Sequence, residues 1–369
     1  MKQLRKLSLF LAILGLLGLL VFPAAGQNST PAQIKAEITR LEQSLKDEPL
    51  SDPDLKTIAP MVTDALKSAR ESANAGQLYL SLEKLGQVED LLQGALSAAD
   101  KAEVEKAGLP AFESRWGKAS LRLIALDKDA HAREWKDSPL AIRALAETAQ
   151  GRAIPLLEGG RGFATATGAK EGLFYVGEAE GEADFSTFCA SLQFEGKPSS
   201  FALRSLLPEL QALQEKTNAA FKPPKSIDLH TRFIALNSQI KLAQELDASR
   251  FFGGALYAYL DAVRHYGMLD APPLDPSAQG QVRKDVARLT KDLAASSGDN
   301  SILQLFLERA NSYVAHPDGS APSTDEWRGA RVIVDQVVPA YYAAQKPAAP
   351  VTTPSGKTVD ITLVRWPYT

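Results

Sequence analysis

Cysteine and histidine are scarce in this chain of 369 residues, which contains one cysteine and four histidines. A single thiol cannot form an intramolecular disulfide, so apolar packing must hold the fold together. The cysteine, Cys189, lies in an apolar helical pattern between Phe185 and Leu192. We therefore expect a buried and unreactive thiol at this position.

The sequence also lacks the common catalytic motifs. It has no His-Glu-x-x-His, no Gly-x-Ser-x-Gly, no Walker loop, no Cys-x-x-Cys and no Asp-x-Asp-x-Asp-Gly calcium loop. The net charge of −3 comes from mixed charges rather than a concentrated basic patch, which argues against a nucleic-acid partner. These absences favour a protein without catalysis and without a cofactor, although an enzymatic function remains the alternative.

The first 26 residues have the pattern of a secretory signal peptide. Lys2, Arg5 and Lys6 are followed by an apolar run from Leu7 to Phe22, and then by Ala24-Ala25-Gly26. The apolar run is short for a membrane-spanning helix, so cleavage is favoured over a retained anchor. The expected location is periplasmic or extracellular, with no integral membrane span after cleavage.

The remaining 343 residues would carry a net charge of −6 and exceed what one hydrophobic core usually covers. We therefore expect several segments. They are a signal peptide (1–26), an N-terminal helical lobe (27–158), a glycine-rich crossing with middle helices (159–225), a C-terminal helical lobe (226–345), and a tether with a strand-like tail (346–369).

Helix signals recur along the whole chain, which predicts an all-α fold. Apolar residues at helical spacing follow start signals of the Ser/Thr/Asp-Pro or capping-box type. These starts lie at Thr30 with Gln33, Asp52-Pro53, Ser138-Pro139, Ser226, Asp275-Pro276, and Ser323 with Glu326. The pattern indicates about twelve antiparallel helices, arranged as helical hairpins that could stack as a solenoid.

A short pattern, Gly-x-Leu/Phe-Tyr, occurs three times and ends in Tyr79, Tyr175 and Tyr257. Its glycines, Gly76, Gly172 and Gly254, suit left-handed turns that end one helix before the next begins. If the three tyrosines line one concave groove, they are candidate binding residues. Chance recurrence in a helix-rich chain is an equal alternative.

One segment combines carboxylates with an imidazole at helical spacing. Asp127, His131 and Glu134 would share a helix face and could form half of a metal site. Lys128 and Arg133 favour the alternative, a solvated face whose charges neutralise one another.

The segment from Gly159 to Gly172 is rich in glycine and contains Arg161 and Lys170. We expect a mobile crossing between two lobes, and Arg161 and Lys170 are candidate ligand contacts on that loop. Further on, Glu178 and Glu182 could form an acidic ridge. The favoured alternative is a polar outer face, whose opposite side, with Gly177 and Gly181, lets a neighbouring helix approach closely.

The function favoured by these observations is an exported bacterial scaffold, or a module that binds a protein or peptide of the cell envelope. The alternatives are a metal-dependent hydrolase and a small-molecule binding protein, each with its site between the helical lobes. The alternating residues Val359, Ile361 and Leu363 of the tail could add a strand to a partner.

Overall fold

The computed structural model describes residues 29–47, 56, 58–99, 104, 106–135, 138–166, 168–194, 203–223, 226–316 and 319–346. Three sequence predictions lie outside these residues. They are the signal peptide (1–26), the helix start at Asp52-Pro53, and the tail beyond Lys346.

The described residues form helices and no strand, which confirms the all-α prediction. The N-terminal helices are α2 (Thr30–Asp47), α3 (Ile58–Asn74), α4 (Leu78–Ala99), α6 (Leu109–Ala132), α7 (Leu140–Ala166) and α8 (Ala169–Ser191). The C-terminal helices are α9 (Leu207–Ala220), α10 (His230–Ala248), α11 (Phe252–Asp270), α12 (Pro276–Ala295), α13 (Ser301–Val314), α14 (Thr324–Val332) and α15 (Val338–Ala344). A 3-10 turn (Ile227–Leu229) precedes α10, and a π-helical turn (Ile333–Val337) joins α14 to α15.

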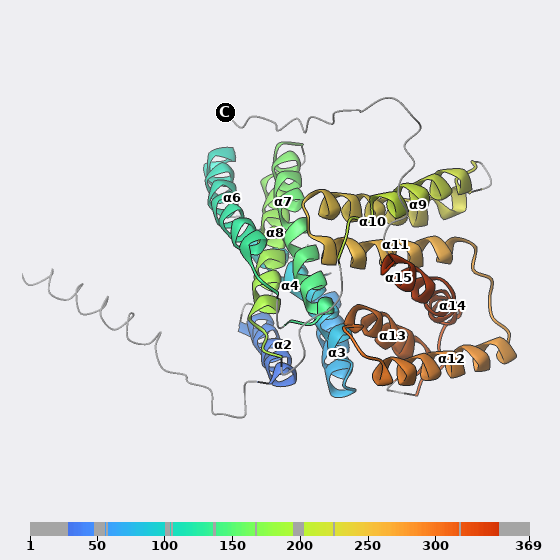
Figure 1. The fold of residues 1–369 in the computed structure, drawn as a ribbon. Coiled ribbons are helices and arrows are strands. Elements are labelled where there is room, and N and C mark those ends of the chain that lie inside the picture. Colours follow the sequence, from blue (N-terminus) through green and yellow to red (C-terminus); the bar gives the residue numbers. More distant parts are fainter. Residues whose placement is uncertain are drawn as a thin grey trace, which may run out of the picture.

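Two helix groups lie side by side in Figure 1. The N-terminal helix group consists of α2 to α8, in which α8 packs along both α4 and α7, and the C-terminal helix group consists of α9 to α15. The two groups touch where α11 contacts α7 and where α13 contacts α4. One cluster of buried apolar side chains extends from Ile34 in α2 to Ala344 in α15, so the groups share a core. The proposed lobe boundaries and the antiparallel, solenoid-like details stay predictions.

Two of the expected helix starts are confirmed in atomic detail. The Asp275 carboxylate accepts a hydrogen bond from the backbone N–H of Ala278 at 2.8 Å and caps α12. Ser323 and Glu326 form a complete capping box at the start of α14. Both side chains satisfy backbone N–H groups that would otherwise lack partners at a helix start.

The predicted cap at the start of α2 is wrong. Thr30 is already helical, and the backbone oxygen of Ser29 accepts the first hydrogen bonds. The Thr30 hydroxyl donates instead to the backbone oxygen of Gln193, while the Gln33 side chain accepts from the Gln193 N–H at 3.2 Å. Tertiary contact therefore replaces local capping and fastens α2 to the end of α8.

The α4–α8 interface depends on missing side chains, as the sequence predicted for Gly177 and Gly181. A Cβ atom at Gly177 would lie 2.2 Å from the backbone oxygen of Gln93, and one at Gly181 would lie 2.7 Å from that of Glu89. The expected polar outer face is wrong, however, because Glu182 is 2% exposed. The Cys189 thiol is also buried, as expected.

The expected glycine-rich loop is largely helix, which corrects the predicted crossing. α7 continues to Ala166, so the break before α8 is short. A Cβ atom at Gly160 would lie 3.0 Å from the backbone oxygen of Gly172, and one at Gly172 would lie 2.5 Å from the Cβ of Ala164. These glycines therefore serve the close packing of α7 against α8 rather than a flexible loop.

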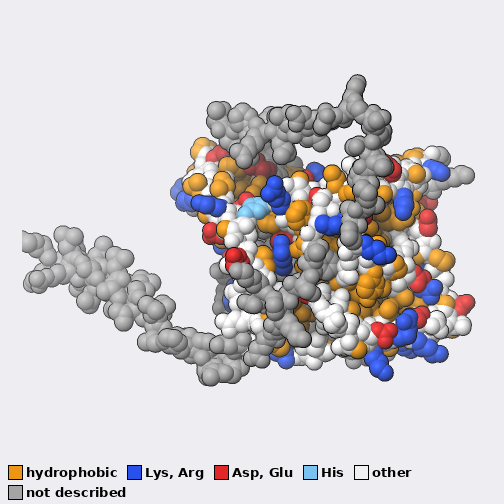
Figure 2. Space-filling model, viewed as in Figure 1, with side chains coloured by type: hydrophobic (Ala, Val, Ile, Leu, Met, Phe, Trp, Pro, Cys, Tyr) orange, Lys and Arg blue, Asp and Glu red, His pale blue; other side chains and the backbone are white. Residues whose placement is uncertain are grey.

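None of the helices in the described part of the chain combines the length and hydrophobicity that a bilayer crossing requires. Figure 2 shows Lys, Arg, Asp and Glu side chains scattered over the visible face, with apolar side chains gathered over the region of α11 and α15.

Candidate binding groove

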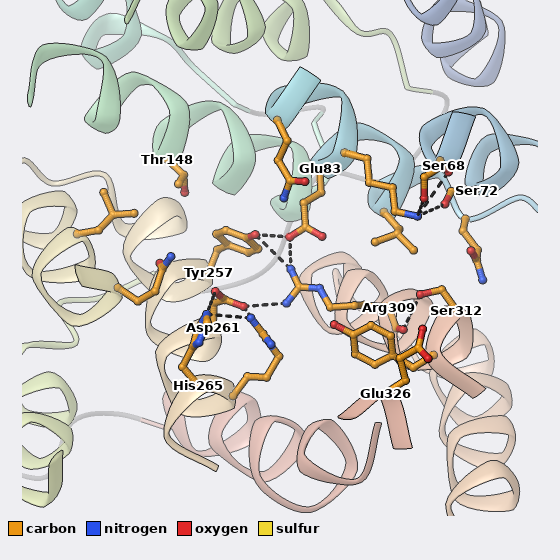
Figure 3. A pocket seen from close by; sticks show the side chains of 18 of the residues that line it. Ser68, Ser72, Glu83, Thr148, Tyr257, Asp261, His265, Arg309, Ser312 and Glu326 are labelled. Atoms are coloured by element: carbon orange, nitrogen blue, oxygen red, sulfur yellow. Dashed lines mark hydrogen bonds and ion pairs between the residues drawn. The ribbon is translucent and has the colours of Figure 1, made fainter. Parts of the chain in front are cut away.

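A groove of about 1140 Å³ lies between the N-terminal and C-terminal helix groups (Figure 3). Residues of α3, α4 and α7 line one side, and residues of α10, α11, α13 and α14 line the other. Many of the lining side chains are neutral and polar: Ser68, Ser72, Gln77, Gln87, Thr148, Ser238, Gln239 and Ser312.

A buried arginine joins three helices at the base of the groove. The Arg309 guanidinium, from α13, donates to Asp261 of α11 at 2.7 Å and also to Glu83 of α4. The Tyr257 hydroxyl, from α11, donates to Glu83 as well (Figure 3). Since Glu83, Asp261 and Arg309 are each less than a tenth exposed, these contacts form a buried network across the two helix groups.

A second arginine balances the charge of this network. Arg264 Nε donates to Asp261 Oδ1 at 2.8 Å, and His265 Nε2 lies 3.4 Å from Asp261 Oδ2. Burial opposes ionisation of Asp261, but Arg264 and Arg309 outweigh it and hold the pKa of this carboxyl well below its ordinary value. Two carboxylates therefore face two guanidiniums, and the base of the groove is close to neutral overall.

Lys84 of α4 is held in the groove by neutral oxygens. Its Nζ atom donates to Ser68 Oγ at 2.6 Å and to Ser72 Oγ at 3.0 Å. The backbone oxygen of Ser68 lies 3.4 Å away and offers a third acceptor. Burial lowers the pKa of Lys84 from its ordinary value. Among the described residues, no carboxylate lies within ion-pair distance of this ammonium.

Arg152 of α7 connects the groove to a pair of buried carboxyl groups. Its guanidinium lies 2.9 Å from Glu182 and 3.6 Å from Asp90. Burial, partly offset by Arg152, raises the pKa of Glu182 to about 8 and that of Asp90 to about 6. The two carboxyl groups share one buried site beside Arg152, so burial opposes the ionisation of both at once.

The three tyrosines of the repeated pattern do not line one groove, so the condition that would make them a shared binding surface is not met. Tyr257 lies in the groove, whereas Tyr79 lines a second hollow of about 940 Å³ between the start of α4 and helices α12 and α13. Tyr175 stacks on Phe163, with ring centroids 4.5 Å apart. Only the first of the three sites has the expected left-handed turn, at Gly76, because the glycines of the other two lie inside α8 and α11.

The weak metal candidates do not form a metal site. Asp127 and His131 lie on α6 with 3.8 Å between Oδ2 and Nε2, but the helix ends at Ala132, so Glu134 leaves the shared face. The His131 ring stacks on Phe251 with centroids 4.2 Å apart. No cluster suited to a metal ion occurs among the described residues.

Arg161 lies on helix α7 rather than on the expected loop. Its guanidinium is 3.1 Å from a Glu113 carboxylate oxygen and 4.7 Å from the centre of the Trp116 ring. Lys170 belongs to the first turn of α8, and its side chain is outside the described structure. Arg161 and Lys170 stay predictions as ligand contacts, and Arg161 does not line the groove.

No protein family, curated protein or solved structure matches this chain. Any inference about function therefore depends on the groove. Sequence reasoning missed its central residues, Glu83, Asp261 and Arg309. The available signal was a charged residue inside an apolar helical stretch, as in Leu-Phe-Leu-Glu-Arg-Ala from 305 to 310.

Proposed function

We propose that this protein is a helical binding module of the cell envelope, and that its groove receives a polar peptide segment of a partner protein. The observation that carries the proposal is the contrast between the base of the groove and its walls. The base is an internally paired network around Arg309, whereas the walls offer serine hydroxyls and glutamine amides among a few charged groups such as Glu71 and Glu245. Such groups match the donors and acceptors of an extended peptide backbone.

The dimensions of the groove favour a peptide over a small molecule. Typical small-molecule sites have about 300–1,000 Å³ and mostly apolar linings. The groove of about 1140 Å³ is larger than this range, and many of its lining residues are polar. The metal-dependent hydrolase loses support, because Asp127 and His131 share a face of α6 whereas Glu134 lies beyond the end of that helix.

A bulky substitution on the wall tests the proposal. Ser238 is an exposed residue of α10 that lines the groove, so Ser238→Trp should fill part of it without disturbing the core. Thr231→Trp is the matched control, because Thr231 is exposed on the same helix and does not line the groove. Binding of the purified protein to a pool of random peptides on beads should fall about tenfold for Ser238→Trp only.

Two outcomes would contradict the proposal. One is that beads carrying the peptides retain no more wild-type protein than uncoated beads do. The other is that both tryptophan variants bind as the wild type does, since peptides would then attach to a surface other than the groove.

Export is a separate part of the proposal, and it rests on the pattern of residues 1–26. We expect the protein from the bacterial envelope to begin near Gln27 when its intact mass is measured. A mass that still includes Met1 to Gly26 would contradict cleavage and favour a retained anchor.

A further inference from the structure

We infer that the groove selects peptides that carry a carboxylate, and that Lys84 is the residue that binds it. This inference rests on the proposed function and names the chemical class of the ligand. It starts from the balance of charges in the groove, where one cation differs from the others.

The arginines of the groove are all engaged by carboxylates of this chain. Arg309 pairs with Glu83 and Asp261, and Arg264 pairs with Asp261. Arg152 pairs with Glu182 at 2.9 Å. A ligand anion that approached these guanidiniums would have to compete with buried partners already in place.

Lys84 differs because the groups that bind its ammonium directly are neutral, whereas the carboxylates of Glu83 and Glu71 act on it only from beyond ion-pair distance. The hydroxyls of Ser68 and Ser72 orient the ammonium without neutralising it. The residue is partly buried, so an incoming anion would gain more here than at a fully hydrated lysine. Gln87, one turn further along α4, lines the same groove and offers an amide to the ligand beside the ammonium.

The chemistry of this position favours a carboxylate over a phosphate. A phosphate carries up to two charges and is commonly bound by the planar fork of an arginine. Here the arginines are occupied, and one ammonium with two hydroxyls remains to balance a single charge. An aspartate, a glutamate or the C-terminal carboxylate of a peptide each supplies such a group.

Two peptide pools, immobilised on beads, provide the test. One contains random sequences with free C-termini, and the other contains amidated peptides without aspartate or glutamate. We expect the full-length protein to bind the first pool about tenfold more tightly, which is the loss expected for one charge-assisted hydrogen bond. Acetate should compete with the first pool for the protein. Phosphate at the same ionic strength should compete no better than acetate does.

The variant Lys84→Met should remove the preference between the two pools. Lys118→Met is the matched control, because Lys118 is an exposed residue of α6 outside the groove and its loss changes the net charge equally. Thermal unfolding of both variants checks that they fold. The comparison of the two pools with wild-type protein needs no variant, so it tests the carboxylate preference even if a variant does not fold.

Each other outcome overturns the inference in a recognisable way. Equal binding of both pools by the wild type would reject the carboxylate preference and leave the peptide groove intact. A preference that survives in Lys84→Met would place the anion elsewhere. Displacement by phosphate but not by acetate would contradict the preference for a carboxylate over a phosphate. Failure to bind either pool would reject the groove function itself.

Discussion

At the scale of residues, the buried network around Arg309 should dominate the energetics of the groove. Arg309→Met leaves the buried carboxylates Glu83 and Asp261 without this partner, and breaking a buried ion pair on one side typically costs about 3–5 kcal/mol. We expect the free energy of unfolding, measured by urea denaturation, to fall by an amount of that order.

The control for this prediction is Arg288→Met on α12. Arg288 is 60% exposed and contacts Asp285 and Asp292 at the surface, where an ion pair contributes at most about 1 kcal/mol. If both variants lose equally little stability, Arg309 does not hold the helix groups together.

A second residue-scale prediction concerns pH. Burial raises the pKa of Glu182 to about 8 and that of Glu308 to about 7, from an ordinary value of 4.5. The folded chain then binds more protons than the unfolded chain between these values, so its stability falls as the pH rises from about 5 to about 8. Asp261 acts in the opposite sense, because its pKa is lowered and its contribution is lost only as the pH falls below the ordinary value of 3.8.

Thermal unfolding followed by circular dichroism should therefore give a higher Tm near pH 5 than at pH 8. Glu182→Gln keeps the shape of the side chain but cannot ionise, so the decrease between pH 5 and pH 8 should become smaller in this variant. An unchanged pH dependence in Glu182→Gln would show that this carboxyl does not titrate in the buried site.

At the scale of elements, the tight packing of α4 on α8 gives a direct prediction. Gly177→Ala places a methyl group 2.2 Å from the backbone oxygen of Gln93, so the helices must separate. Overpacking of this kind typically costs about 1–3 kcal/mol. The loss should be visible in the free energy of unfolding measured by urea denaturation.

Gly280→Ala on α12 is the matched control, because a Cβ atom there meets nothing within 4 Å. Alanine is the better helix former by up to about 1 kcal/mol, so this variant should gain stability. Similar effects of the two substitutions would mean that Gly177 does not set the distance between α4 and α8.

The sequence predicts elements better than it predicts the site. Local rules identified the caps at Asp275 and Ser323, because a side chain three residues away decides such a cap. They failed for Thr30, whose partner Gln193 lies 163 positions away. They also failed for the expected glycine-rich loop, since Gly160 and Gly172 meet each other only after α7 and α8 have packed.

The groove could not be predicted for the same reason. Arg309 reaches across 226 positions to Glu83 and across 48 to Asp261, and no spacing rule connects them. The metal hypothesis failed in a different way, because it relied on a spacing rule that holds only within a continuous helix. Asp127, His131 and Glu134 have helical spacing, but α6 ends at Ala132, before the third of them.

At the scale of the whole molecule, two helix groups share one apolar core and enclose a polar groove where they meet. Charges at the base of the groove are paired within the protein, so its walls are left to contact a ligand. A rigid base with polar walls is a suitable arrangement for a segment that docks without reorganising the fold.

Amide hydrogen exchange of the full-length protein, with and without peptides selected from the random pool, tests this account most directly. We predict that bound peptide slows exchange in the wall segments 68–77, which covers the end of α3 and the turn after it, and 238–245 of α10, with no change in α6. Slower exchange in α6 with unchanged wall segments, or no protection anywhere, would contradict it.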